Sequence, residues 1–466
     1  MTSSTTTINR PPSSSKSALS RLINSMGMPI LALILAFVIG ALVIFLTSYF
    51  SNGFQFSRAL TTVGLAYDGL WRGAFIKERA FSETLIVTIF YILLALGVAI
   101  GFKAGLFNIG VEGQYYIGAV CAAWAGQATF SLPAIIHLPL ALLAGAIGGA
   151  IWAGIPGFLK ARTGAHEVIT TIMMNYIAFR LTEFLISGPL KDKASSATQT
   201  PTVSKAAQIW TLYSIPERLK DPLNALAVAI LVAFLVILLV RLLLGLPSLS
   251  QRITGKVKRQ AIILGSGGLF GLLSFFLLPP LAQAWWPFKD PYDRMHIGLL
   301  LALGAAVFVW WVLWRTTWGF ELRTVGANPS AARYAGVNIT RNIVLVMAFS
   351  GALAGLSGTI DVLGVLPCRC MQLFFSSGYG FDSIAIALLA KNNPFGIIAS
   401  SFLWGAMRNG ADLMELNSGV SKYIMSLVQA LALLFVAAPG IVRWFLHLKA
   451  EKKLEEEAPL TRGWGG

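Results

Sequence analysis

The segment Gly105-Leu-Phe-Asn-Ile-Gly-Val-Glu-Gly-Gln114 lies between two long apolar runs and carries glycines, an amide and a carboxylate. A carboxylate at bilayer depth costs on the order of 3 kcal/mol, so Glu112 is expected to face protein, a cavity or a partner rather than lipid. Glycines allow the backbone to break or to pack closely, and a broken helix is tolerated at this depth only where it lines a cavity or is buried in protein. The segment therefore predicts an interrupted helix inside a membrane protein.

The rest of the sequence has the composition of a membrane protein. Of its 466 residues, 56% are hydrophobic and only 12% are charged, and the mean hydropathy is +0.71. A transmembrane helix needs about 20 mainly apolar residues, so we predict an all-α polytopic fold with about 10–12 transmembrane helices, including broken or half helices. The expected spans are Met28–Phe50, Glu83–Gly101, Leu106–Gln127, Pro133–Phe158, Val168–Gly188, Leu223–Leu244, Ala261–Leu281, His296–Trp314, Asn342–Leu366, Phe381–Ala390, Phe395–Met414 and Tyr423–Leu446.

A second interrupted segment lies nearer the C-terminus. Gly378-Tyr-Gly-Phe-Asp382 precedes a short apolar run, which ends at Lys391-Asn-Asn-Pro-Phe-Gly396. The run has only about 11 residues, which span about half of the hydrocarbon core and predict a half-helix. One interrupted segment in each half of a transporter points to a translocation site, although both segments could instead be packing motifs with internally satisfied polar groups. The predicted pathway residues are Asn108, Glu112, Gln114, Phe381, Asp382, Asn392 and Asn393.

The charges of the loops predict the orientation in the membrane. The chain carries a net charge of +16, and its basic residues gather in loops on one side if the spans alternate. These loops are residues 160–162, 252–259 and 315–341, and the positive-inside rule assigns them to the cytoplasm. Residues 51–82 fit the positive-inside rule poorly, because alternation of the spans places them outside the cell although they contain several basic side chains. Both termini are then cytoplasmic, in a multi-pass protein of the inner (plasma) membrane.

Three regions follow from this pattern. Residues 1–27 are expected to form a disordered cytoplasmic tail, residues 28–446 the transmembrane domain, and residues 447–466 a cytoplasmic tail. Basic loops between apolar spans, without a sizeable polar domain, indicate contact with membrane lipid and not with nucleic acid.

The loop between Arg315 and Asn342 contains a short helix of its own. Asn328 can cap its start, with Pro329 at the first helical position, and Gly336 can close it. The small side chains of Ala331, Ala332 and Ala335 suit insertion into a groove on another protein. The loop therefore predicts a docking element.

Three passages together carry a family resemblance: GLFNIGVEGQYYIG at 105–118, GANPSAARYAGVN at 326–338, and GFDSIAIALLAKNNPFG at 380–396. They resemble the permease subunits of bacterial ABC importers in the branched-chain amino acid, ribose and nucleoside permease superfamily, and most closely its nucleoside and simple-sugar branch. The chain departs from that family at 223–281, where an extra pair of apolar spans indicates an inserted helix pair.

The resemblance implies partners and a coupling helix. The helix in the 315–342 loop would seat on an ATP-binding subunit, and the chain would pair with a second permease protomer, expected to make a heterodimer, and with an extracytoplasmic substrate-binding lipoprotein. The residues that the resemblance places at the ATPase are Gly326, Asn328, Pro329, Ala331, Ala332, Tyr334 and Gly336.

Nucleotide chemistry is not expected in this chain. Its Gly255-Lys256 pair has Ser250 where a phosphate-binding loop would have its first glycine, so ATP and Mg would be held by the partner and no cofactor by this chain. The sequence has no H-E-x-x-H motif and its histidines are scattered, which argues against an enzyme. Its three cysteines predict neither a disulfide framework nor a metal site, and Cys368 and Cys370 are expected to be incidental.

Alternatives remain open at this stage. A secondary transporter could use Glu112 or Asp382 as a proton or sodium site. Within the ABC class, ribose, galactose or a branched-chain amino acid could replace the nucleoside, because no residue identifies the solute.

Overall fold

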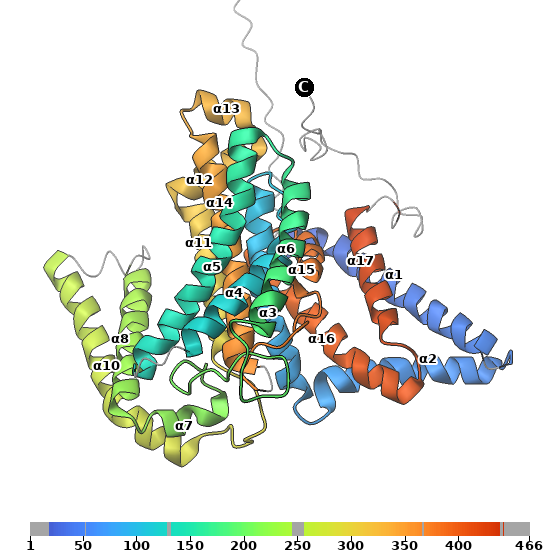
Figure 1. Ribbon diagram of the computed structural model, residues 1–466, viewed down its shortest axis with the longest axis horizontal. Helices are drawn as coiled ribbons and strands as arrows, with labels where there is room; N and C mark the ends of the chain where they lie inside the picture. Colours follow the sequence, from blue (N-terminus) through green and yellow to red (C-terminus); the bar gives the residue numbers. More distant parts are fainter. Residues whose placement is uncertain are drawn as a thin grey trace, which may run out of the picture. The chain divides into compact units, whose positions relative to one another are not determined.

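The computed structural model describes residues 18–51, 53–127, 132–244, 256–365, 368–438 and 441. Within these ranges the chain is helical and contains no β-strand, apart from two isolated bridges (Figure 1). It forms two compact units. The terminal unit comprises Met1–Gly64 and Val420–Gly466, and the central unit comprises Leu65–Gly419.

The terminal unit is built on the packing of α1 (Ala18–Ser51) against α17 (Tyr423–Ala437). Residues 18–27, which were expected to belong to a disordered tail, are helical, whereas the expected tails at 1–17 and 447–466 lie outside the described residues. Ile30, Ile34, Val38 and Leu42 on α1 are exposed and recur every fourth residue, so they form one apolar face. Such a face is typical of a helix that contacts lipid.

The central unit has a core of four helices: α3 (Ala80–Lys103), α4 (Val111–Gln127), α5 (Ala134–Thr163) and α14 (Ile339–Ile360). The stretch from Ile89 to Gly101 on α3 is buried throughout, which makes α3 the central helix of this unit. In contrast, α5 exposes Leu143, Ile147 and Ile151 along one face. The apolar runs that look alike in the sequence therefore divide into buried and lipid-facing helices.

Glycines allow α4, α5 and α14 to pack backbone against backbone. A Cβ atom on Gly355 of α14 would lie 2.3 Å from the carbonyl oxygen of Gly145 on α5. A Cβ on Gly118 of α4 would lie 2.2 Å from the Cα of the same Gly355. Close approach through small residues is a general way for membrane helices to associate, because lipid provides no hydrophobic driving force between them.

Further helices are present in the described part of the chain, and each expected span overlaps one of these or one of the helices already named. They are α2 (Phe56–Trp71), η1 (Arg72–Ile76), α6 (Glu167–Ser187), η2 (Leu212–Ser214), α7 (Ile215–Arg218), α8 (Pro222–Leu243), α10 (Lys256–Trp285), α11 (Gly298–Arg315), α12 (Thr317–Ala327), α13 (Pro329–Tyr334), η3 (Asp361–Val365), α15 (Tyr379–Leu389) and α16 (Pro394–Ser418). Among the described residues, seven helices are long and apolar enough to cross a membrane, or up to eight with a bent pair that includes α7 and α8. The protein is thus an all-α polytopic membrane protein, and the expected inserted pair is α8 and α10, which pack on each other.

Two groups of segments mark opposite ends of the central unit. The turn between α5 and α6, where Lys160 pairs with Glu167 at 2.9 Å, lies with α13 at one end (Figure 1). Residues 188–220 lie at the other end, where Val203 N donates to Arg369 O at 2.9 Å. Cys368 and Cys370, expected to be incidental, form a disulfide in this second group.

Two of the four basic residues in 51–82 form ion pairs, Arg72 and Arg79. Arg72 lies 3.7 Å from Asp68, and Arg79 bonds to Asp290 in the loop before α11. The hydrogen bond from Arg79 lowers the pKa of the Asp290 carboxyl below its ordinary value. Because Asp290 lies outside residues 51–82 and neutralises Arg79, the excess positive charge around this segment is smaller than its own residues suggest.

Candidate translocation site

The first interrupted segment is a helix break between α3 and α4, held by the amides of Asn108 and Gln114. Each amide donates to the other at 2.9 Å, and Asn108 also donates to Ser350 Oγ at 2.8 Å and accepts from Gly110 N at 3.0 Å. Both side chains are buried. All four hydrogen-bonding positions of the Asn108 amide are thereby used, so these two predicted pathway residues stabilise the break.

Glu112 joins the two interrupted segments. It lies in the first turn of α4, only 2% exposed, and its carboxylate accepts from Gly380 N and from Ser376 Oγ, both at 2.5 Å. A Cβ on Gly380 would lie 2.6 Å from Glu112 N, so glycine is needed for this contact. The positive end of α15 is consequently occupied by a carboxylate of the chain itself.

The half-helix α15 has 11 residues and begins after Gly378, whose φ is +85°. It ends in a tight turn in which Lys391 and Asn392 have φ values of 51° and 55°, and Asn393 caps α16 by accepting from Phe395 N at 3.0 Å. This turn lies about 17 Å from Glu112, the length of α15. The structure therefore does not bring Asn392 and Asn393 together with the other predicted pathway residues.

Asp382 belongs to a charged cluster that the sequence did not reveal. Its Oδ2 atom accepts from Tyr91 OH at 2.7 Å and from Arg408 Nη1 at 2.9 Å. Arg408 also donates to Ser377 O at 2.8 Å, and its guanidinium lies 4.7 Å from the centre of the Tyr379 ring. The signal that could have identified Arg408 is its charge inside the apolar span 395–414.

Aromatic rings surround the start of α15. Tyr115 stacks on Phe375 with ring centres 5.2 Å apart, and Tyr116 contacts both Phe375 and Phe179 at 4.8 Å. Phe381, a predicted pathway residue, is 47% exposed. The site thus combines buried, half-buried and exposed rings with the charged cluster of Asp382 and Arg408.

The helix predicted to be a docking element, α13, forms as the capping residues predict. Asn328 Oδ1 accepts from Ala331 N at 3.0 Å, Pro329 occupies the first turn, and Gly336 has a φ of +79°. Tyr334 is 98% exposed. Ala332 differs from the expectation, because it is fully buried and holds α13 on its own chain.

Gly326 places α12, which leads into α13, directly on the helix break. A Cβ on Gly326 would lie 2.3 Å from Lys103 O, and a Cβ on Gly105 would lie 3.4 Å from the Cα of Gly326. The exposed helix is therefore in backbone contact, through α12, with the segment that holds Asn108.

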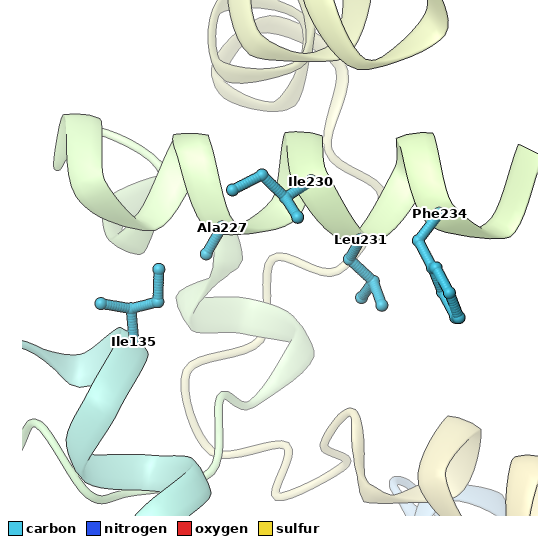
Figure 2. A pocket seen from close by; sticks show the side chains of 5 residues that line it. All are labelled: Ile135, Ala227, Ile230, Leu231 and Phe234. Carbon is cyan, nitrogen blue, oxygen red and sulfur yellow. The ribbon is translucent and has the colours of Figure 1, made fainter. Parts of the chain in front are cut away.

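A cavity of about 340 Å³ lies away from these groups, between α5 and α8 (Figure 2). Its lining side chains are Ile135, Ala227, Ile230, Leu231 and Phe234. All of them are apolar, so this cavity offers a polar solute no hydrogen bond. In the described part of the chain, no three His, Cys, Asp or Glu side chains are grouped to hold a metal ion.

A polytopic helical protein in which two interrupted helices bring charged groups together has the features of a membrane permease. The chain belongs to the family described as branched-chain amino acid transport system / permease component, whose model matches residues 80–437. It is 35% identical to the guanosine ABC transporter permease protein NupP of Bacillus subtilis, over 91% of this chain and 96% of the relative.

Two other relatives extend this comparison. The nucleoside ABC transporter permease protein NupB of Lactococcus lactis is 28% identical, over 93% of this chain and 96% of its own. The glucose ABC transporter permease protein TsgB13 of Haloferax volcanii is 29% identical, over 80% of this chain and 79% of its own. No solved structure matches the chain.

Proposed function

We propose that this chain is the membrane-spanning permease subunit of an ABC importer, which moves a nucleoside or a simple sugar inward with ATP hydrolysed by a partner. The contact of Gly326 with Lys103 carries the proposal. A partner that moves α13 also moves α12, and α12 rests on the helix break between α3 and α4. Motion at the docking helix therefore reaches Asn108 and Glu112 through packed backbone.

The ATP-binding subunit, with its ATP and Mg, seats on the exposed face of α13. Tyr334 and Ala331 are exposed there and form the contact, while Asn328, Pro329 and Gly336 shape the helix. The buried Ala332 transmits the movement to the rest of the chain. Aromatic side chains at the centre of an interface often contribute most of its binding energy, which favours Tyr334 as the anchor.

The remaining partners follow from the orientation. With α13 and both termini in the cytoplasm, residues 188–220 lie at the external end, where the substrate-binding lipoprotein delivers the solute. A second, different permease protomer completes the pathway.

An uncharged solute suits the site best. The positive end of α15 would otherwise favour the carboxylate of an amino acid, but Glu112 already occupies it. NupP, NupB and TsgB13 are named for guanosine, nucleosides and glucose, all of which lack a carboxylate.

Reconstitution of the permease with its ATPase and binding protein tests this function. ATP should drive uptake of guanosine, and Ala331→Arg should abolish both ATPase association and uptake, because it places a large cation on the docking face. Ala194→Arg is the matched control for ATPase association, because it places the same large cation on an exposed alanine at the opposite end, and it should keep the ATPase bound. Ion-dependent uptake that persists without the ATPase would instead establish the secondary transporter.

A further inference from the structure

The ion pair of Asp382 and Arg408 lies near the middle of the membrane. Asp382 bonds to Tyr91, which is close to the centre of α3 (Ala80–Lys103). At about 1.5 Å per residue, Tyr91 is about 17 Å from either end of that helix. Substrate sites of membrane transporters lie at this depth.

The pair is nevertheless not enclosed by the chain. The side chain of Asp382 is 31% exposed and that of Arg408 is 29% exposed. Lipid tails cannot hydrogen-bond to either group, and a charged side chain at this depth faces a water-filled cavity or a polar partner. The exposed part of the pair therefore marks the polar face of the central unit in the middle of the membrane.

The pair also has hydrogen-bonding positions to spare. Both bonds that the Asp382 carboxylate accepts end on Oδ2, and Oδ1 accepts none from the described part of the chain. Arg408 makes three hydrogen bonds to described residues, and its guanidinium has five N–H donors. The pair thus offers a free acceptor beside free donors and carries no net charge. It suits an uncharged ligand group that both donates and accepts hydrogen bonds, and a hydroxyl is such a group.

We propose that Asp382 and Arg408 bind the sugar hydroxyls of the solute in the middle of the membrane, the ribose of a nucleoside or a free hexose. This assignment rests on the proposed transport function. Tyr91 is a positioning residue, because it is fully buried and bonds to both members of the pair. The pair thus gives the pathway a preference for hydroxylated, uncharged solutes.

Thiol labelling of the permease–ATPase complex in nanodiscs, without the binding protein, tests the proposal. Ser377→Cys is made in a Cys121→Ser background, because Ser377 is exposed and its carbonyl accepts from Arg408. Ile147→Cys on the exposed apolar face of α5 is the control. A charged methanethiosulfonate should modify Ser377→Cys more than about tenfold faster than Ile147→Cys, because the reactive thiolate forms only in water.

Solutes are then added to identify the ligand chemistry. Guanosine should slow the labelling of Ser377→Cys, and D-glucose should do so if the free hexose is the solute. The analogue 2′,3′-dideoxyguanosine should leave the rate unchanged. Asp382→Asn in the same background should keep the labelling and lose the protection.

Two results would overturn the proposal. One is that Ser377→Cys is as inert as Ile147→Cys, which means that protein or lipid covers the pair. The other is equal protection by guanosine and its dideoxy analogue, or protection that survives in Asp382→Asn. Either result can occur while ATP-driven uptake is intact, so this inference can fail without the proposed function. Conversely, the result could be that ATP drives no uptake while guanosine still protects Ser377→Cys and its dideoxy analogue does not. That outcome rejects the importer, and the assignment of Asp382 and Arg408 as a hydroxyl-binding site stands.

Discussion

Replacement of Gly326 by alanine tests whether the docking helix is coupled to the helix break. The new Cβ would lie 2.3 Å from Lys103 O and 2.9 and 3.0 Å from the C and Cα atoms of Ala104. All three are backbone atoms and cannot rotate away, so α12 must shift from the end of α3. Overpacking of this kind costs about 1–3 kcal/mol. We expect a lower melting temperature of the purified permease and poorer coupling of ATP hydrolysis to transport.

The assay measures uptake per ATP hydrolysed in proteoliposomes, together with thermal unfolding in detergent. Gly154→Ala is the matched control, because this helical glycine of α5 has no neighbouring atom within 4 Å of a new Cβ. Alanine there should be neutral or stabilise by up to about 1 kcal/mol. If Gly326→Ala matches Gly154→Ala in both melting temperature and uptake per ATP, the mechanical link through α12 is wrong.

Three further changes have defined outcomes. Tyr334→Ala should weaken ATPase binding about 30-fold, because loss of an interface anchor costs about 2 kcal/mol. Unchanged affinity in a pull-down titration would exclude Tyr334 as the anchor. Glu112→Leu removes the acceptor of Gly380 N and leaves this buried donor unpaired at a cost of about 1–3 kcal/mol, so thermal unfolding should occur at a lower temperature and an unchanged melting temperature would contradict the bond. Gly355→Ala would put a methyl group 2.3 Å from Gly145 O, so expression and melting temperature should both fall, and a wild-type melting curve would argue against this backbone contact.

Helix positions and caps could be predicted where a few neighbouring residues determine them. Apolar runs located the helices, and the short run before Lys391 predicted the half-helix α15. The Asn-Pro start predicted α13, since a cap depends on a few neighbouring residues. The helices α2 and η1 were missed, because residues 51–82 mix polar and apolar side chains without a long apolar run. The burial of Ala332 could not be predicted either, because it depends on where α13 packs.

The sequence by itself determined the membrane class, the positions of the long apolar helices, the two interrupted segments and the short capped helix α13. Hydropathy, glycine placement and capping are properties of a few consecutive residues, and they survive in any tertiary arrangement. Only the tertiary structure decided which polar groups meet. The bond from Gly380 to Glu112 spans 268 positions, and the bond from Tyr91 to Asp382 spans 291. Such contacts depend on how the helices pack. Packing buries Asn108 and Gln114 in the helix break, and it leaves the side chains of Asp382 and Arg408 partly exposed.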